Sequence, residues 1–367
     1  MKNRHRLYVV SLVLFLALSF IVPYTVFLIR PSIFYWRAWE YFSEVVYPNS
    51  YRTRVWNGFE KGDMTRSYLF YFQDKYFTHV STDADGFRLG PYYTDEYKIL
   101  VYGDSHCWGS RLSNNETFSW RLALKLHKPV FNGGRETLLR KILGKNELRK
   151  VNLVINVIDA MHVKIKELFP DNFIIDEYVP MKEYNKVSLS VKRFYPTSFI
   201  IRAAKIVKND ISIVKNNNDN RPYLCGSEYK VPFFDNENDV NKVYRKKNSL
   251  YEEILERQVE MISNFSRQLL QRGYIYILVL VPRKDLLYAD KVDEYSKEYF
   301  PRLIRKLEEE GVYAVDLQKD FIANKDKGLF FHTDTHWNER GTEIAAEVVT
   351  RYLREKGLLN NVLLTKN

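Results

Sequence analysis

Three things are scarce or missing in this sequence. It has no internal repeat, which excludes an architecture built of repeated units. It has no RNA- or DNA-binding motif, and its net charge of +11 comes from scattered basic residues, so no nucleic-acid partner is expected. Only two cysteines occur, Cys107 and Cys225, and their spacing leaves one disulfide and two free thiols as equal alternatives.

The composition excludes a disordered chain. Hydrophobic residues make up 46% of the 367 residues and aromatic residues 15%, enough to build a sizeable core in one large domain or two small ones. The excess of basic residues suits an acidic polysaccharide and an anionic lipid surface equally well.

One long stretch has no charge. Tyr8 to Ile29 would span roughly 33 Å as a helix, against a hydrocarbon core of about 30 Å. The stretch is long for a signal peptide, and no small-x-small cleavage site follows it. Lys2, Arg4 and Arg6 precede it, which indicates a cytoplasmic N-terminus. We therefore expect residues 1–30 to form a transmembrane anchor in a bacterial inner membrane, with the body periplasmic or extracellular.

The rest of the chain divides by composition. Residues 31–80 are rich in Trp, Tyr and Phe, and either pack near the membrane surface or complete the core of the domain. Residues 81–358 form the main domain, and 359–367 a tail. Residues 163–249 carry five prolines and a polar run, which predicts a long insertion with a loop around 209–248.

Outside that insertion, strand and helix patterns alternate, which predicts an α/β fold: a parallel sheet covered by helices in three layers, with a site at the carboxyl ends of the strands. The predicted strands are Lys98–Tyr102, Pro129–Phe131, Val151–Ile158, Ile275–Val281 and Val312–Leu317. The predicted helices are Thr117–Leu126, Thr137–Leu148, Tyr251–Arg272, Glu294–Glu310 and Gly341–Lys356.

A serine follows the first of these strands. Gly103-Asp104-Ser105 places Ser105 where a strand turns into a helix, so that its hydroxyl points outward and its N–H faces a developing oxyanion. The tripeptide alone fits an N-capped turn equally well. Cys107 is a rival nucleophile, but Ser105 holds the position nearer the strand end.

Asp334 and His336 lie two positions apart, just before the last helix. On an extended segment two such residues share a face, so the carboxylate can orient the imidazole toward a serine. A metal cluster of His332, Asp334 and His336 is the alternative, but no further ligand is near, and no metal or cofactor is expected. His332 and His106 are interpreted as polar lining or surface residues.

These motifs resemble the SGNH (GDSL-like) hydrolase superfamily, and within it the membrane-associated branch of alginate O-acetyltransferase-type periplasmic proteins. The resemblance implies a flavodoxin-like α/β/α domain over about 81–162 and 251–353. It is carried by Asp85-Gly86-Phe87-Arg88, Gly103-Asp104-Ser105 with Gly109, Asn115-Glu116-Thr117-Phe118, Asn132-Gly133-Gly134, Val281-Pro282-Arg283-Lys284 with Tyr288, and Asp334-Thr335-His336-Trp337 with Gly341.

The resemblance also implies roles. Ser105 would be the nucleophile, His336 the base and Asp334 its orienting carboxylate, while the N–H groups of Ser105 and of Gly133 or Gly134 would form the oxyanion hole. Two features depart from the family. The family's third sequence block has an asparagine just after a strand. This sequence lacks it at that place, and Asn156 lies inside the predicted strand instead. The serine block precedes the Asp-x-His block, as in ordinary SGNH hydrolases but not in the alginate-type proteins.

Four further residues are candidates for substrate binding. Lys284 and Tyr288 follow a strand end and suit a carboxylated or hydroxylated sugar, whereas Trp108 and Trp337 offer aromatic faces for stacking. Solvated loop residues and core packing are the respective alternatives.

Three functions are compatible with these features. The first is a membrane-anchored O-acetyltransferase or O-acetylesterase acting on cell-surface polysaccharide; a transferase would need a separate multi-pass membrane acyltransferase as partner. The second is a lipase or thioesterase on the same scaffold. The third is a degenerate scaffold that binds glycan without catalysis, for which Ser105 would lie far from His336.

Overall fold

The computed structural model describes residues 2–29, 54–62, 75–83, 85–134, 139–159, 204, 207–208, 211, 222–225, 231–234, 249–288 and 294–359. Most of the predicted insertion and nearly all of the predicted tail fall outside these residues. Within the insertion, the described residues include an antiparallel strand pair, β6 (Pro222–Cys225) and β7 (Val231–Phe234), where the sequence predicts a loop.

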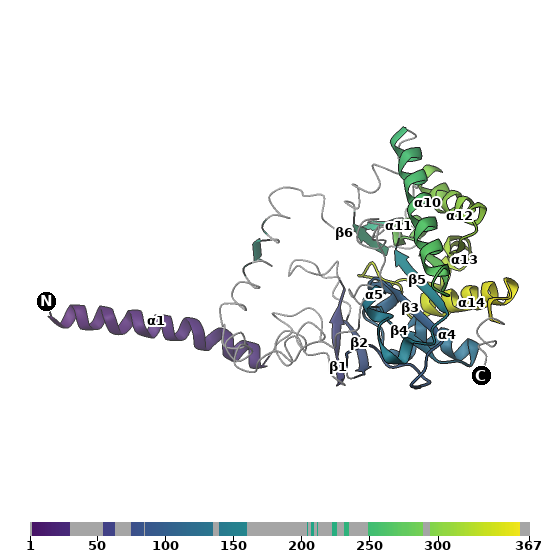
Figure 1. The fold of residues 1–367 in the computed structure, drawn as a ribbon. Coiled ribbons are helices and arrows are strands. Elements are labelled where there is room, and N and C mark those ends of the chain that lie inside the picture. The colour runs from purple at the N-terminus through teal and green to yellow at the C-terminus, as the bar shows by residue number, and fades with distance from the viewer. Residues whose placement is uncertain are drawn as a thin grey trace.

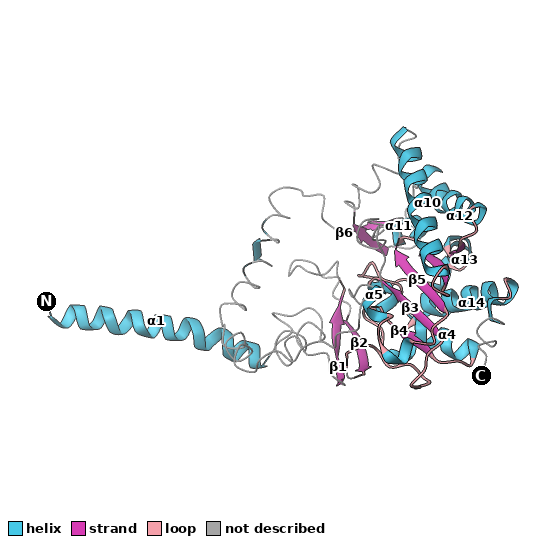
Figure 2. Ribbon diagram, viewed as in Figure 1, coloured by secondary structure: helices cyan, strands magenta, loops and turns pink. Residues whose placement is uncertain are grey.

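The centre of the molecule is a five-stranded parallel sheet in the order β4-β3-β5-β8-β9, and its strands lie among the helices in Figure 2. Its strands are β3 (Ile99–Gly103), β4 (Val130–Asn132), β5 (Leu153–Asp159), β8 (Ile275–Val281) and β9 (Tyr313–Asp316). All five predicted strands are present, and the predicted α/β fold with a parallel sheet is confirmed. The order reverses between β3 and β5, and such a switch point is where open α/β sheets place their sites.

Two hydrophobic clusters show that helices cover both faces. Side chains that alternate along the strands pack on one face against α4 (Phe118–Leu126) and α14 (Glu339–Glu355). On the other face they pack against α5 (Leu139–Ile142), α10 (Ser249–Leu270) and α12 (Glu294–Glu309). This is the predicted three-layer arrangement, and it arises because each strand is buried on both faces.

Several short helices interrupt the longer elements. The predicted helix Thr137–Leu148 is replaced by α5 and a 3₁₀ turn, Asn146–Leu148. The others lie in loops around the sheet: α3 (Ser105–Trp108), α11 (Lys284–Tyr288), α13 (Gln318–Ala323) and the 3₁₀ turns Asn114–Glu116 and Lys325–Lys327.

An antiparallel hairpin precedes the sheet in sequence and packs against the same body. It consists of β1 (Arg54–Lys61) and β2 (Lys75–Thr82) (Figure 1). The Ser81 N–H donates to Asn114 Oδ1 at 3.3 Å, and the Tyr76 and Phe331 rings meet edge to face with centroids 4.8 Å apart. The described residues of the predicted aromatic-rich segment, 54–62 and 75–80, thus lie against the domain, and the division of the chain at residue 80 stays a prediction.

The N-terminal segment is the helix α1 (Lys2–Ile29). In the part of the chain that the structure describes, no helix combines a bilayer-spanning length with enough apolarity to cross a membrane.

Candidate active site

Ser105 is placed by the tight turn that ends β3. Gly103 has φ of 151°, and a Cβ there would lie 1.8 Å from the Val157 carbonyl oxygen of β5, so only glycine fits. Asp104 caps α3: one carboxylate oxygen accepts the His106 N–H at 2.8 Å, and the other accepts the Asp159 N–H at 2.7 Å. The aspartate of the Gly-Asp-Ser motif thus ties the serine loop to the end of β5.

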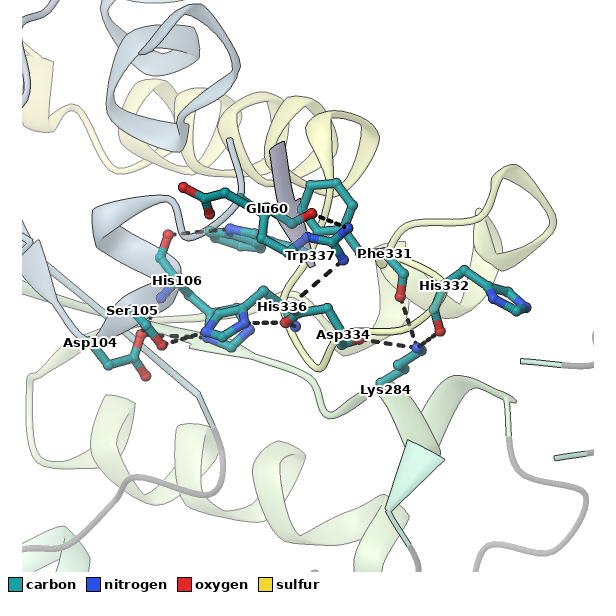
Figure 3. Close-up of polar contacts among 11 residues, drawn as sticks. Glu60, Asp104, Ser105, His106, Lys284, Phe331, His332, Asp334, His336 and Trp337 are labelled. Carbon is teal, nitrogen blue, oxygen red and sulfur yellow. Dashed lines mark hydrogen bonds and ion pairs between the residues drawn. The ribbon is translucent and has the colours of Figure 1, made fainter. Parts of the chain in front are cut away.

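The structure brings Ser105, His336 and Asp334 together from opposite ends of the domain (Figure 3). Ser105 Oγ lies 2.6 Å from His336 Nε2, and His336 Nδ1 contacts Asp334 Oδ1. The same carboxylate oxygen accepts the His336 backbone N–H at 3.0 Å. With Nδ1–H directed at the carboxylate, Nε2 is left to accept the serine proton, which is the arrangement of a serine hydrolase triad.

These three residues differ in their exposure to solvent. Asp334 is fully buried and His336 is 5% exposed, whereas Ser105 is only partly buried. The carboxylate is thus kept from water while the hydroxyl remains accessible, as a reacting group requires.

A second histidine–aspartate pair lies beside the first. The His106 ring is buried 4.9 Å from the His336 ring, and His106 Nδ1 lies 3.5 Å from Asp104 Oδ1. Burial alone would lower the pKa of His106, but the nearby Asp104 carboxylate, with smaller contributions from Asp159 and Asp334, raises it to about 9. Burial likewise opposes ionisation of Asp104, yet His106 and two backbone N–H groups lower its pKa to about 2.

The loop that carries Asp334 is held by Lys284. The buried ammonium donates to three carbonyl oxygens of this loop, those of Phe331 at 2.8 Å, His332 at 2.7 Å and Asp334 at 3.0 Å. A lysine has three donors, and all three are used here. The prediction that Lys284 binds substrate is therefore not supported, because its charge is directed inward at the loop.

The oxyanion hole differs from its prediction. The Gly133 N–H donates to the Val101 carbonyl at 2.7 Å and so extends the parallel ladder, while the Gly134 N–H donates to Asn132 Oδ1 at 3.0 Å. Both amides are thus engaged elsewhere, and this geometry favours neither as an oxyanion donor. The Ser105 N–H, at the first position of α3, keeps that predicted role. Asn156 is fully buried and its amide donates to the Tyr276 hydroxyl at 3.0 Å, inside the sheet.

Two of the other predicted substrate residues are buried by packing. Trp337 has no exposed surface, and its Nε1 donates to the His106 carbonyl at 3.2 Å. The Tyr288 hydroxyl donates to the Lys325 carbonyl at 3.2 Å and accepts the Leu329 N–H at 2.9 Å. Neither presents a surface to a sugar. Trp108 is partly buried, and the Arg88 guanidinium covers one ring face at 4.9 Å, so its predicted role in stacking stays a prediction.

His332 and Cys107 decide between the predicted alternatives of a metal cluster and a disulfide. His332 is exposed, and its ring points away from Asp334 and His336 (Figure 3). Over the described residues, no group of three His, Cys, Asp or Glu side chains could hold a metal ion. Cys107 is a free thiol, so it is not bridged to Cys225.

Replacing Cys107 by alanine tests the rival nucleophile. Burial, with a smaller contribution from Asp104, raises the pKa of the Cys107 thiol well above its usual range, so the reactive thiolate is not formed at neutral pH. We expect the variant to lose some stability, roughly 1–2 kcal/mol for a small core cavity, and to keep its activity per folded molecule. The measurement is hydrolysis of a chromogenic acetyl ester, normalised to the folded fraction; loss of turnover in a folded variant would make Cys107 the nucleophile.

Sequence reasoning missed one residue at this site. Arg111 is 1% exposed, and its Nη1 lies 3.7 Å from Asp334 Oδ2. The one sequence signal for Arg111 is its closeness to the serine motif. The sequence does not show that residue 111 faces residue 334.

The resemblance to the SGNH superfamily of the alginate O-acetyltransferase type is confirmed by comparison with known proteins. Residues 239–363 match a family model described as "SGNH hydrolase-like domain, acetyltransferase AlgX". This range contains Asp334 and His336 but not Ser105.

Three curated relatives also match, and each is named "Probable alginate O-acetylase AlgJ". The Pseudomonas putida protein is 25% identical over 115 residues, which is 30% of each chain. The Pseudomonas aeruginosa protein is 27% identical over 112 residues, or 29% of each chain. The Pseudomonas syringae pv. tomato protein is 27% identical over 95 residues, or 24% of each chain. The matched region thus spans less than a third of these relatives.

Among solved structures, the crystal structure of the Bacillus subtilis protein YXIM aligns with a TM-score of 0.34 and 13% identity, over 78% of this chain and 69% of that one.

Proposed function

We propose that this chain, with its SGNH-type domain, is a serine acyl-transfer enzyme that adds or removes acetyl esters on a polysaccharide. The observation that carries the proposal is the contact chain from Ser105 Oγ through His336 to Asp334, with 2.6 Å between hydroxyl and imidazole. The similarity to AlgX and AlgJ supports acetyl as the acyl group and an alginate-like polymer as the acceptor or ester. The non-catalytic scaffold, which predicts a distant serine, is opposed by the same distance.

The geometry supports a two-step reaction. His336 Nε2 takes the Ser105 proton as Oγ attacks the acyl carbonyl, and the Ser105 N–H at the start of α3 donates to the developing oxyanion. The imidazolium then gives its proton to the leaving oxygen, and Ser105 is left acylated. A sugar hydroxyl or a water, deprotonated by His336, resolves the acyl-enzyme; the first makes the enzyme a transferase, the second an esterase.

The location and the membrane partner that we propose for this protein rest on its sequence. The uncharged stretch Tyr8–Ile29 behind Lys2, Arg4 and Arg6 supports a body outside the cytoplasm, next to the inner membrane. Acetyl groups activated in the cytoplasm would then have to cross the membrane, which is why we propose a separate multi-pass membrane acyltransferase as donor.

The test is hydrolysis of a chromogenic acetyl ester by the full chain and by Ser105→Ala, each with and without an alginate oligosaccharide. We expect the variant to lose about 10³-fold or more of the turnover, because alanine has no hydroxyl to carry the acyl intermediate. Faster release together with an acetylated oligosaccharide would identify a transferase. A release rate that does not change with the oligosaccharide would identify an esterase. Equal rates for both proteins would rule out Ser105 as the nucleophile.

A further inference from the structure

Arg111 lies behind the triad in a backbone conformation that a side-chain-bearing residue rarely adopts. Its φ is 62°, in the left-handed region that favours glycine. The turn after α3 would therefore form more easily with glycine at this position. An arginine here calls for an explanation in what its side chain does.

The guanidinium is held at three places. Nη1 lies 3.7 Å from Asp334 Oδ2, an ion pair between two side chains that are both fully buried. Nη2 donates to the Glu60 carbonyl of β1 at 3.3 Å, and the guanidinium carbon lies 4.5 Å from the centre of the Phe331 ring. The hairpin that supplies Glu60 also presses on the same loop, since a Cβ on Gly62 would lie 1.8 Å from the Thr333 carbonyl oxygen.

The two oxygens of Asp334 are thus divided between two partners. Oδ1 serves His336 through its ring and its backbone N–H, and Oδ2 faces Arg111. A carboxylate buried away from water is costly to keep ionised unless a cation compensates it. A neutral Asp334 would no longer stabilise the imidazolium that forms when Ser105 is deprotonated.

We propose that Arg111 is a positioning residue for this reaction: clamped by the Glu60 carbonyl, its guanidinium keeps Asp334 ionised and turned toward His336. The inference rests on the proposed function, because the positioned group is the triad carboxylate. The other charged or titratable groups around the pair are His106 with Asp104 behind it, and Lys284 on the backbone of the same loop.

The test compares Arg111→Met and Arg111→Gly with the wild-type full chain in acetyl ester hydrolysis as a function of pH. Methionine keeps the length of the stem without charge, and glycine suits the left-handed backbone, so that one of the two retains the fold. We expect kcat to fall roughly 10–100-fold, as when an outer partner that orients a functional group is lost. We expect the acidic limb of kcat/KM to move to higher pH, because Asp334 takes up a proton more readily without the Arg111 cation. Millimolar guanidinium is expected to restore rate and profile in Arg111→Gly.

The matched control is Arg121→Met, which removes a partly exposed arginine that pairs with Glu343 on the surface. It should keep the wild-type profile. Suppose that a folded Arg111 variant keeps the wild-type acidic limb and that added guanidinium does not change its rate. Arg111 then has only a packing role, and the proposal is overturned.

A measurement that does not depend on turnover distinguishes failure of the role proposed for Arg111 from failure of the proposed function. In full chain carrying ¹³C-labelled aspartate, the Asp334 carboxyl signal is identified by its absence from Asp334→Asn. Its titration should move to higher pH in Arg111→Gly, whether or not the protein hydrolyses esters, because the buried carboxylate loses the cation that faces it. An unmoved titration would overturn the role of Arg111, and a wild type without Ser105-dependent hydrolysis would overturn the proposed function alone.

Discussion

His336→Gln is expected to lower the turnover of a chromogenic acetyl ester by about 10³–10⁶-fold, with little change in the folded fraction. The reason is that His336 Nε2, 2.6 Å from Ser105 Oγ, is the one base in contact with that hydroxyl among the described residues. Glutamine retains a side chain of similar reach but cannot accept and return the proton at neutral pH. The measurement is steady-state hydrolysis with protein whose fold has been checked by circular dichroism.

The matched control for this variant lies four residues earlier. His332→Gln removes an exposed imidazole that points away from the triad, and it should hydrolyse the ester at the wild-type rate. A slow His332→Gln beside an active His336→Gln would mean that the wrong histidine has been assigned as the base.

The second large effect is expected from Lys284→Met. Its ammonium makes three charge-assisted hydrogen bonds to the loop that carries Asp334, at 2.7, 2.8 and 3.0 Å. Methionine fills similar space but leaves three carbonyls of that loop without this donor, so we expect the free energy of unfolding to fall by roughly 3–5 kcal/mol. Turnover of the remaining folded protein should fall as well, since Asp334 loses its fixed position. Urea unfolding and ester hydrolysis measure the two effects.

Lys297→Met is the control, because Lys297 lies exposed on α12. It should change the free energy of unfolding by no more than about 0.5 kcal/mol. A Lys284→Met protein as stable and active as this control would show that Lys284 does not hold the loop, and would reopen its predicted role in substrate binding.

The sheet and the two motifs that carry Ser105 and the Asp334–His336 pair could be predicted because each depends on neighbouring residues in the sequence. Apolar runs such as Ile275–Val281 identify buried strands by composition alone, and the structure has that strand with the same bounds. Gly103 and Ser105 are separated by one residue, so the turn that exposes the serine is a local property. The fold then brings residues 105 and 336 together: Ser105 follows β3, and His336 lies in the loop between the 3₁₀ turn Lys325–Lys327 and α14.

What the sequence did not reveal depends on long-range packing. Lys284 follows a strand end whether it binds substrate or holds a loop, so its position in sequence does not distinguish the two roles. Only the fold decides whether its ammonium faces a substrate or a buried loop. Gly133 fits an oxyanion hole by position, but its N–H is claimed by the ladder with β3. The hairpin β1–β2 also escaped prediction, because its aromatic residues show no strand period distinct from that of an amphipathic surface segment.

The most direct test of the account is to label the protein with a fluorophosphonate, a reagent that phosphonylates activated serines, and to locate the label by tandem mass spectrometry. Ser105 and Ser110 share one tryptic peptide, Ile99–Arg111, so fragmentation must assign the site. We predict stoichiometric labelling of Ser105 in the wild type and labelling slower by orders of magnitude in His336→Gln. Labelling elsewhere, or at equal rates in the two proteins, would contradict the claim that His336 activates Ser105.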